Sequence, residues 1–263
     1  MKPLSIYNPF NAPVYHEDTV DSTMEVSRAL ARNGAPHGTV IAADFQSAGR
    51  GRLRERAWHA ERGINLAFTI LLRFSGVEGI PPALTLRTGL AVSLAIEDFA
   101  PALAGCVLIK WPNDIFIAQP SAVGKAAGIL TEADGGDARI GIGVNVGQKR
   151  FPDFLRGRAA SIGLALNREI ADGERYELLE KILTRLHAEI ETSSRGAAND
   201  WRGRIEARLY QKGRPVCFVE GPAGSEKTVT GVLSGIGPGG ELLLTPDGGS
   251  ETLSFTTGEL RLT

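Results

Sequence analysis

Apolar residues at helical spacing predict helices over residues 22–33, 83–99 and 174–191. The third segment is amphipathic, so we expect it to cover one face of a sheet. At the start of the first segment, Ser22 and Glu25 have the spacing of a capping box, in which each side chain satisfies a free amide of the first turn.

Short apolar runs bounded by Gly, Pro and Asp predict strands between these helices, at residues 39–45, 64–73, 107–111, 114–118, 125–131 and 140–146. We expect these runs to form a mixed sheet. Beyond about residue 211 the chain becomes rich in Gly and Pro, and short alternating stretches at 214–220, 228–234, 241–245 and 251–255 predict a small antiparallel barrel. The predicted fold class is α+β, with one domain over residues 1–210 and a C-terminal barrel over residues 211–263.

Composition excludes several classes of protein. The 263 residues carry 29 Lys and Arg against 30 Asp and Glu, so any anion-binding site must be local, not a global basic surface. Cys106 and Cys217 form no CxxC pattern and the histidines show no ligand spacing, which argues against a disulfide framework or a zinc site and favours the cytoplasm. Residues 1–10 contain no apolar run long enough for a signal peptide or membrane span.

A polar loop follows the first predicted strand and contains Gly49-Arg50-Gly51-Arg52. Glycine lets a backbone approach a ligand closely, and guanidinium groups bind phosphate oxygens in a fork. A solvated flexible loop is the alternative, but concentrated positive charge in a nearly neutral protein favours a ligand. Trp58 is compatible with stacking on a purine, although a single tryptophan is more often a core residue.

The segment Lys110-Trp111-Pro112-Asn113-Asp114 ends an apolar run. A strand-turn-strand corner accounts for its last three residues but not for the lysine and the tryptophan. Lys125 begins the next strand, where a lysine that blocks aggregation at a sheet edge is the simpler interpretation.

Gly141, Gly143 and Asn145 alternate and therefore share one face of a strand, where glycine clears space for a ligand. The spacing is not GxGxxG, so a Rossmann dinucleotide site is not supported. The absence of a GxSxG motif argues against serine hydrolase chemistry.

Taken in order, the segments 21–23, 46–58, 110–114, 125–130 and 141–145 resemble the biotin protein ligase family. The resemblance implies a class II synthetase-like catalytic sheet, the biotin-lipoate ligase fold, followed by an SH3-like barrel. It implies that biotin and ATP, with Mg²⁺, form biotinyl-5′-AMP, and that the biotinyl group then passes to a lysine of a biotin carboxyl carrier protein.

The resemblance also implies roles for individual residues. Catalysis would fall to Lys125, Asp114 and Arg50, with Asp114 positioning or accepting a proton from the acceptor amine, although a buried turn aspartate would look the same in sequence. The residues implied to contact biotin are Ser22, Thr23, Gln46, Gly49, Arg50, Arg52, Lys125, Gly128 and Gly143. Those implied to contact the nucleotide are Arg50, Arg52, Trp58, Lys110, Asn113, Lys125 and Asn145.

The chain departs from the family pattern in places. Met24 stands where the family usually has asparagine, residues 53–57 replace a shorter glycine-containing stretch, and the hairpin at 119–121 is enlarged. The Asp-Ser-Thr motif follows only about 20 residues, too few for a helix-turn-helix domain, so we expect no DNA-binding function.

Alternatives remain at this point. A lipoate-protein ligase or octanoyltransferase would have a similar sheet, and a non-catalytic vitamin-binding or protein-interaction module would leave the charges of the first half unexplained. We expect no membrane association, and an exposed edge strand is compatible with a homodimer.

Overall fold

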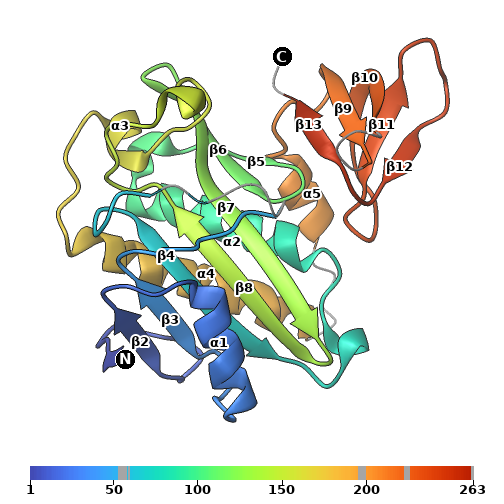
Figure 1. Cartoon of the computed structure of the whole chain (residues 1–263). Helices are drawn as coiled ribbons and strands as arrows, with labels where there is room; N and C mark the ends of the chain where they lie inside the picture. Colours follow the sequence, from blue (N-terminus) through green and yellow to red (C-terminus); the bar gives the residue numbers. More distant parts are fainter. Residues whose placement is uncertain (53–57, 59, 195–199, 222–225, 262–263) are drawn as a thin grey trace.

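The computed structural model describes residues 1–52, 58, 60–194, 200–221 and 226–261. An eight-stranded sheet in the order β1-β2-β3-β4-β8-β7-β6-β5 forms the centre of the molecule (Figure 1). Only the β2–β3 pairing within it is parallel, so the predicted mixed sheet is confirmed. Its strands are β1 (Lys2–Pro3), β2 (Val14–Glu17), β3 (Val40–Ala43), β4 (Leu66–Arg73), β5 (Val107–Lys110), β6 (Asp114–Gln119), β7 (Ala122–Asp134) and β8 (Asp137–Val144).

Helices cover both faces of this sheet. The long helices α2 (Leu84–Phe99) and α4 (Glu174–Ser194) pack together behind it, whereas α1 (Thr23–Arg32) lies in front of β4 and β8 (Figure 1). Ile140 and Val144 of β8 are fully buried in the core, and the intervening glycines face α1 and the cavity described below. The shorter helices are α3 (Ile162–Leu166), α5 (Trp201–Glu206) and the 3₁₀ turns η1 (Val77–Gly79), η2 (Pro101–Leu103) and η3 (Asp153–Leu155).

One segment, Val77–Phe99, is long and apolar enough to cross a membrane by length and composition. It ends in α2, and 67% of its most apolar stretch is buried inside the protein. Its apolar character is therefore that of a core helix, because the sheet and α4 already cover it.

The C-terminal residues form a separate five-stranded antiparallel sheet in the order β12-β11-β10-β9-β13, beside α5 and apart from the large sheet (Figure 1). The predicted small β domain is thus confirmed at this level. Its strands are β9 (Pro215–Glu220), β10 (Lys227–Ile236), β11 (Leu242–Pro246), β12 (Leu253–Phe255) and β13 (Glu259–Arg261).

The capping-box prediction at the start of α1 is wrong. Ser22 is the N-cap residue and has an extended backbone, but its side chain makes no capping hydrogen bond. The Glu25 carboxylate pairs with the guanidinium groups of Arg28 and Arg50 instead. The Glu25 side chain thus links α1 to the loop that carries Arg50 and does not cap the helix.

The interpretation of Lys125 as an edge-strand residue is also wrong. Strand β7 lies between β6 and β8 and pairs with both. It runs from Ala122 to Asp134, beyond the predicted 125–131 run. Its polar C-terminal end stays in the sheet because it remains paired with β8. A lysine inside the sheet needs another explanation than protection of an edge.

Candidate active site

A cavity opens on the α1 face of the large sheet, where β7 and β8 meet the start of α1. Its wall includes the arginine–glycine loop, defined here as residues 46–52. The described residues that line it are Ser22, Thr23, Met24, Gln46, Arg50, Gly51, Arg52, Trp58, Phe68, Asn113, Lys125, Gly128, Ile129, Leu130, Gly141, Ile142 and Gly143. Segments separated by more than a hundred residues in the sequence thus form one pocket.

One end of the cavity is polar. The side-chain oxygen of Gln46 accepts hydrogen bonds from the backbone N–H of Thr23 (2.9 Å) and from its hydroxyl (3.1 Å). Thr69 in turn donates to the Thr23 hydroxyl at 2.8 Å. This chain of hydrogen bonds fixes the orientation of the Gln46 amide, so the polar end is organised before any ligand binds.

The floor of the cavity is apolar and depends on glycine. Met24 packs over Gly141, where a Cβ would lie 2.9 Å from the Met24 sulfur. The indole of Trp58 covers Gly143, where a Cβ would lie 2.7 Å from the ring. Glycine at these positions lets the side chains of Met24 and Trp58 lie directly on the strand.

Lys125 brings a positive charge into the cavity. Its ammonium lies 2.7 Å from Asp114 Oδ1 and 6.0 Å from the centre of the Trp58 ring. The β6–β7 pairing shifts register between Ile115 and Phe116, which marks a β-bulge at this point. A bulge redirects side chains, and the Lys125 amine consequently lies over Gly128, only 3.0 Å from where a Cβ would be.

Both arginines of the arginine–glycine loop already have partners. Arg50 pairs with Glu25, and Arg52 donates a 2.8 Å hydrogen bond to the carbonyl oxygen of Gly258. Partial burial of the Glu25 carboxyl opposes its ionisation, but the hydrogen bonds and charges of Arg28 and Arg50 outweigh this effect and lower its pKa. Glu25 is therefore an anion that holds Arg50 at the rim of the cavity.

Two buried polar atoms beside the cavity have neither a hydrogen-bond partner nor an ion-pair partner within the described part of the chain. They are the indole nitrogen of Trp58 and the side-chain oxygen of Asn145. Buried polar groups are normally satisfied, so each is suited to bind a polar group of a ligand or a water molecule.

The structure brings most of the predicted site residues together. All residues expected to contact biotin line the cavity except Gly49, which lines an adjoining groove with Trp58, Arg150 and Phe151. Sequence reasoning did not find the remaining apolar lining, from Phe68, Ile129, Leu130 and Ile142, because apolar residues within strands look like core.

Besides Gly49, three predicted residues do not line the cavity. Lys110 is buried and its ammonium lies 5.6 Å from the centre of the Phe116 ring. Asn145 donates to the carbonyl oxygens of Lys125 (3.3 Å) and Ala160 (3.1 Å), and Asp114 reaches the site through Lys125. The insertion predicted at residues 53–57, with Arg54 and Arg56, lies outside the described residues.

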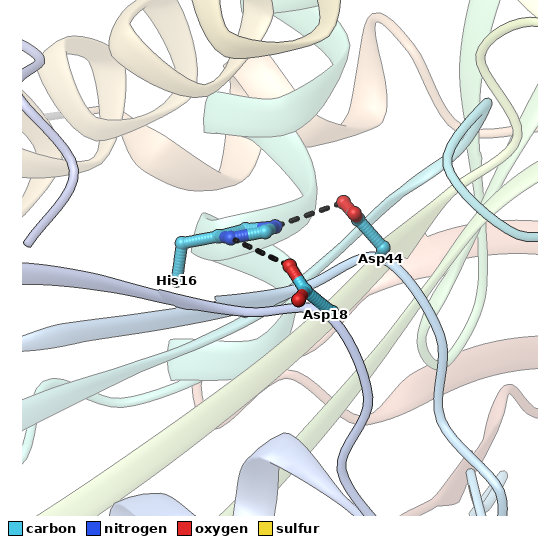
Figure 2. Close-up of side chains that lie close together, drawn as sticks. All are labelled: His16, Asp18 and Asp44. Atoms are coloured by element: carbon cyan, nitrogen blue, oxygen red, sulfur yellow. Dashed lines mark hydrogen bonds and ion pairs between the residues drawn. The ribbon is translucent and has the colours of Figure 1, made fainter. Parts of the chain in front are cut away.

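A second cluster of chemically active side chains lies on β2 and after β3 (Figure 2). His16 Nε2 is 2.8 Å from Asp44 Oδ1, and His16 Nδ1 is 4.0 Å from Asp18 Oδ1. The sequence spacing of the histidines gave no indication of it, because the parallel β2–β3 pairing creates it.

The cluster is an ion-pair network in this structure. Arg175 of α4 also binds Asp44, at 2.8 Å. Partial burial of Asp44 opposes its ionisation, but the His16 hydrogen bond and the Arg175 charge prevail and lower its pKa. The Arg175 guanidinium group supplies the positive charge that a metal ion would supply at this cluster. Because Arg175 belongs to α4, the network also connects α4 to the sheet.

Comparison with known proteins agrees with this geometry. The chain is 38% identical over 177 residues to the bifunctional ligase/repressor BirA of Bacillus subtilis, covering 65% of this chain and 51% of that protein. It therefore spans about half the length of that relative. It is 31% identical over 240 residues to the biotin–[acetyl-CoA-carboxylase] ligase of Mycobacterium tuberculosis, covering 88% and 82% of the two chains.

Among solved structures, the biotin protein ligase of Aquifex aeolicus in complex with biotin and ATP is similar over 95% of this chain and 98% of that chain. The TM-score is 0.76 at 29% sequence identity. The family model described as biotin/lipoate A/B protein ligase matches residues 17–148, which contain every described residue that lines the cavity. From this match and the Mycobacterium relative we conclude that the chain belongs to the biotin/lipoate A/B protein ligase family.

Proposed function

We propose that this protein is an ATP-dependent biotin protein ligase. It would join biotin and ATP into biotinyl-5′-AMP and then transfer the biotinyl group to a lysine of a biotin carboxyl carrier protein. The observation that carries the proposal is the convergence of Arg50, Arg52 and Lys125 on a cavity that is polar at one end and apolar along its floor.

The cavity matches the chemistry of biotin. A cyclic urea needs donors and acceptors, which Ser22, Thr23 and Gln46 provide at the polar end. The fused rings and the acyl chain need an apolar surface, which Phe68, Ile129, Leu130 and Ile142 provide in the lining of the cavity. The carboxylate at the end of the chain needs a cation, and we assign Lys125 to it.

In the first step a carboxylate oxygen of biotin attacks the α-phosphorus of ATP. The new acyl–phosphate bond replaces the bond between the α- and β-phosphates, and pyrophosphate leaves. Two anions must meet, so a well-placed donor in a site shielded from water contributes about 3 kcal/mol to lowering the barrier. Lys125, Arg50 and Arg52 are placed to act in this way.

In the second step the amine of the acceptor lysine attacks the acyl carbon, an amide forms and AMP leaves. The amine must lose a proton, and Asp114 is the carboxylate placed to position it or accept the proton. Asp114 already holds Lys125 at 2.7 Å. The same pair would therefore orient the cation in the first step and the amine in the second.

Magnesium would enter with the nucleotide. The described lining of the cavity contains no Asp or Glu, and Asp114 beside it is engaged by Lys125. Mg²⁺ usually retains water and binds substrate phosphates with few protein ligands. The residues present fit an ion carried by ATP better than a preformed protein site.

We propose in addition that the C-terminal domain is an SH3-like barrel and that the protein is cytoplasmic. The antiparallel C-terminal sheet supports an SH3-like barrel, and the absence of a disulfide between Cys106 and Cys217, both free thiols, supports a cytoplasmic location.

ATP–pyrophosphate exchange tests the function. Purified protein should exchange labelled pyrophosphate into ATP only when biotin is present. Exchange that depends on lipoate or octanoate in place of biotin would assign the chain to the other branch of the family. Exchange with none of these acids would overturn the ligase proposal.

A further inference from the structure

The C-terminal β domain contacts the arginine–glycine loop directly. Arg52 Nη2 donates its 2.8 Å hydrogen bond to Gly258, which lies between β12 and β13. Arg52 also lines the cavity. A guanidinium group has five N–H donors in a planar fork, so one edge of the group can bind the domain while another edge faces the cavity.

Gly258 is fixed in position by the core of its own domain. Its φ is +140°, and a Cβ there would lie 2.2 Å from Phe218 Cζ. Phe218 is fully buried in β9 and pairs with Leu260 of β13. Any side chain at position 258 must therefore displace the turn that presents the carbonyl oxygen to Arg52.

Phe218 also packs near the segment that contains Trp111 and Asn113. Its ring lies 5.9 Å from the ring of Trp111. The Trp111 indole donates to the Gly240 carbonyl oxygen at 3.0 Å. Asn113, two residues further along the chain, lines the cavity. The C-terminal domain thus contacts the arginine–glycine loop through Arg52 and, through Trp111, the segment that leads to Asn113.

We propose that the C-terminal domain is a clasp on the arginine–glycine loop: the Gly258 carbonyl oxygen holds Arg52 over the cavity and slows the escape of a bound acyl adenylate. The inference rests on the proposed function, because it concerns that adenylate. Gly258 is a positioning residue in this view, since it acts through Arg52.

The experiment measures how fast preloaded biotinyl-5′-AMP leaves the full-length protein. Gly258→Ala should accelerate dissociation about fivefold, which is a modest share of what a hydrogen bond to a charged group contributes. The matched control is Gly248→Ala in the same domain, because Gly248 has a φ of +71° but nothing within 4 Å of its Cβ position. This control should dissociate biotinyl-5′-AMP at the wild-type rate.

A double-mutant cycle separates the clasp from a general effect of domain damage. In an Arg52→Ala background, Gly258→Ala should have no further effect on dissociation, because the contact is already lost. An unchanged rate in Gly258→Ala alone, or the same acceleration in both backgrounds, overturns the clasp. Biotin-dependent pyrophosphate exchange by the wild type, measured first, shows separately whether the proposed function holds.

A measurement on the wild-type protein covers the case in which Gly258→Ala does not fold. Hydrogen exchange with and without biotinyl-5′-AMP should show protection in residues 46–52 and in residues 256–259 together. Protection of the loop without protection of the turn overturns the proposal.

Discussion

The indole of Trp58 lies directly against Gly143, so close that a Cβ at position 143 would be 2.7 Å from two ring atoms. Gly143 faces the cavity from β8, and Trp58 covers it from the far side of the arginine–glycine loop. The tryptophan can adopt this position only because the strand has no side chain beneath it.

Gly143→Ala should therefore displace Trp58 and weaken biotin binding by about tenfold or more, since one methyl group in a packed site typically costs 1–3 kcal/mol. Titration calorimetry with biotin measures the change. Gly173→Ala is the control, because a Cβ there meets nothing within 4 Å. Unchanged affinity in Gly143→Ala would mean that Trp58 does not close over the ligand.

Lys125 is expected to act in the first chemical step. Lys125→Gln should lower biotin-dependent pyrophosphate exchange about 100-fold, corresponding to about 3 kcal/mol of lost charge stabilisation. Lys149→Gln, which removes an exposed lysine paired with Glu169, should leave the exchange rate unchanged. A wild-type rate in Lys125→Gln would exclude the ammonium from adenylate formation.

We expect Asp114 to affect the rate of transfer to the acceptor lysine more than the rate of adenylate formation. Asp114→Asn keeps the shape of the side chain but removes the charge that the acceptor amine needs. Transfer from preformed biotinyl-5′-AMP to a carboxyl carrier domain should slow by at least tenfold, and more than adenylate formation does. Full transfer rate in this variant would leave Asp114 only the task of holding Lys125.

The sequence predicted most helices and strands of the large sheet, but not the order of the strands within it or how side chains meet across it. Helices α1, α2 and α4 were predicted from apolar residues at helical spacing, and most strands from short apolar runs. The elements that were missed are short: β1, β2, α3, α5 and β13. Too few residues in each carry a periodic signal, and tertiary contacts decide their conformation.

The sequence likewise predicted which segments form the candidate site but not how their side chains are arranged in it. Motif order predicted that the arginine–glycine loop and Lys125 would share a cavity, and they do. The bulge that places the Lys125 amine over Gly128 has no signature in the sequence, since register is set by pairing with β6. Lys110 is the opposite case. Its place in the motif predicted a contact with the nucleotide, but packing directs its side chain to Phe116.

The contact between Trp111 and Gly240 should stabilise the junction of the two domains. Trp111→Phe removes the 3.0 Å hydrogen bond to the carbonyl oxygen of the half-buried Gly240. We expect the free energy of unfolding to fall by about 0.5–1.5 kcal/mol. Urea denaturation measures it, and an unchanged midpoint would show that the indole N–H contributes nothing to the junction.

Glu174 at the start of α4 provides a test of pH dependence. The hydrogen bond from Arg168, then that from the Ala171 amide, lowers the pKa of Glu174 from 4.5 to about 2. A lowered folded-state pKa stabilises the protein above the unfolded value, and the contribution is lost as pH falls toward the folded value. The wild type should therefore melt at a higher temperature than Glu174→Gln at pH 7. This difference in melting temperature should become smaller as the pH falls from 4.5 to 2.

Thermal denaturation at pH 7 and pH 3 measures this gap. Glu169→Gln is the control, because Glu169 forms an exposed pair with Lys149 and exposed pairs contribute little to stability. Its melting temperature should match the wild type at both values. If the gap for Glu174→Gln were equal at pH 7 and pH 3, the carboxylate would not be the stabilising form, and the Arg168 contact would not anchor the first turn of α4.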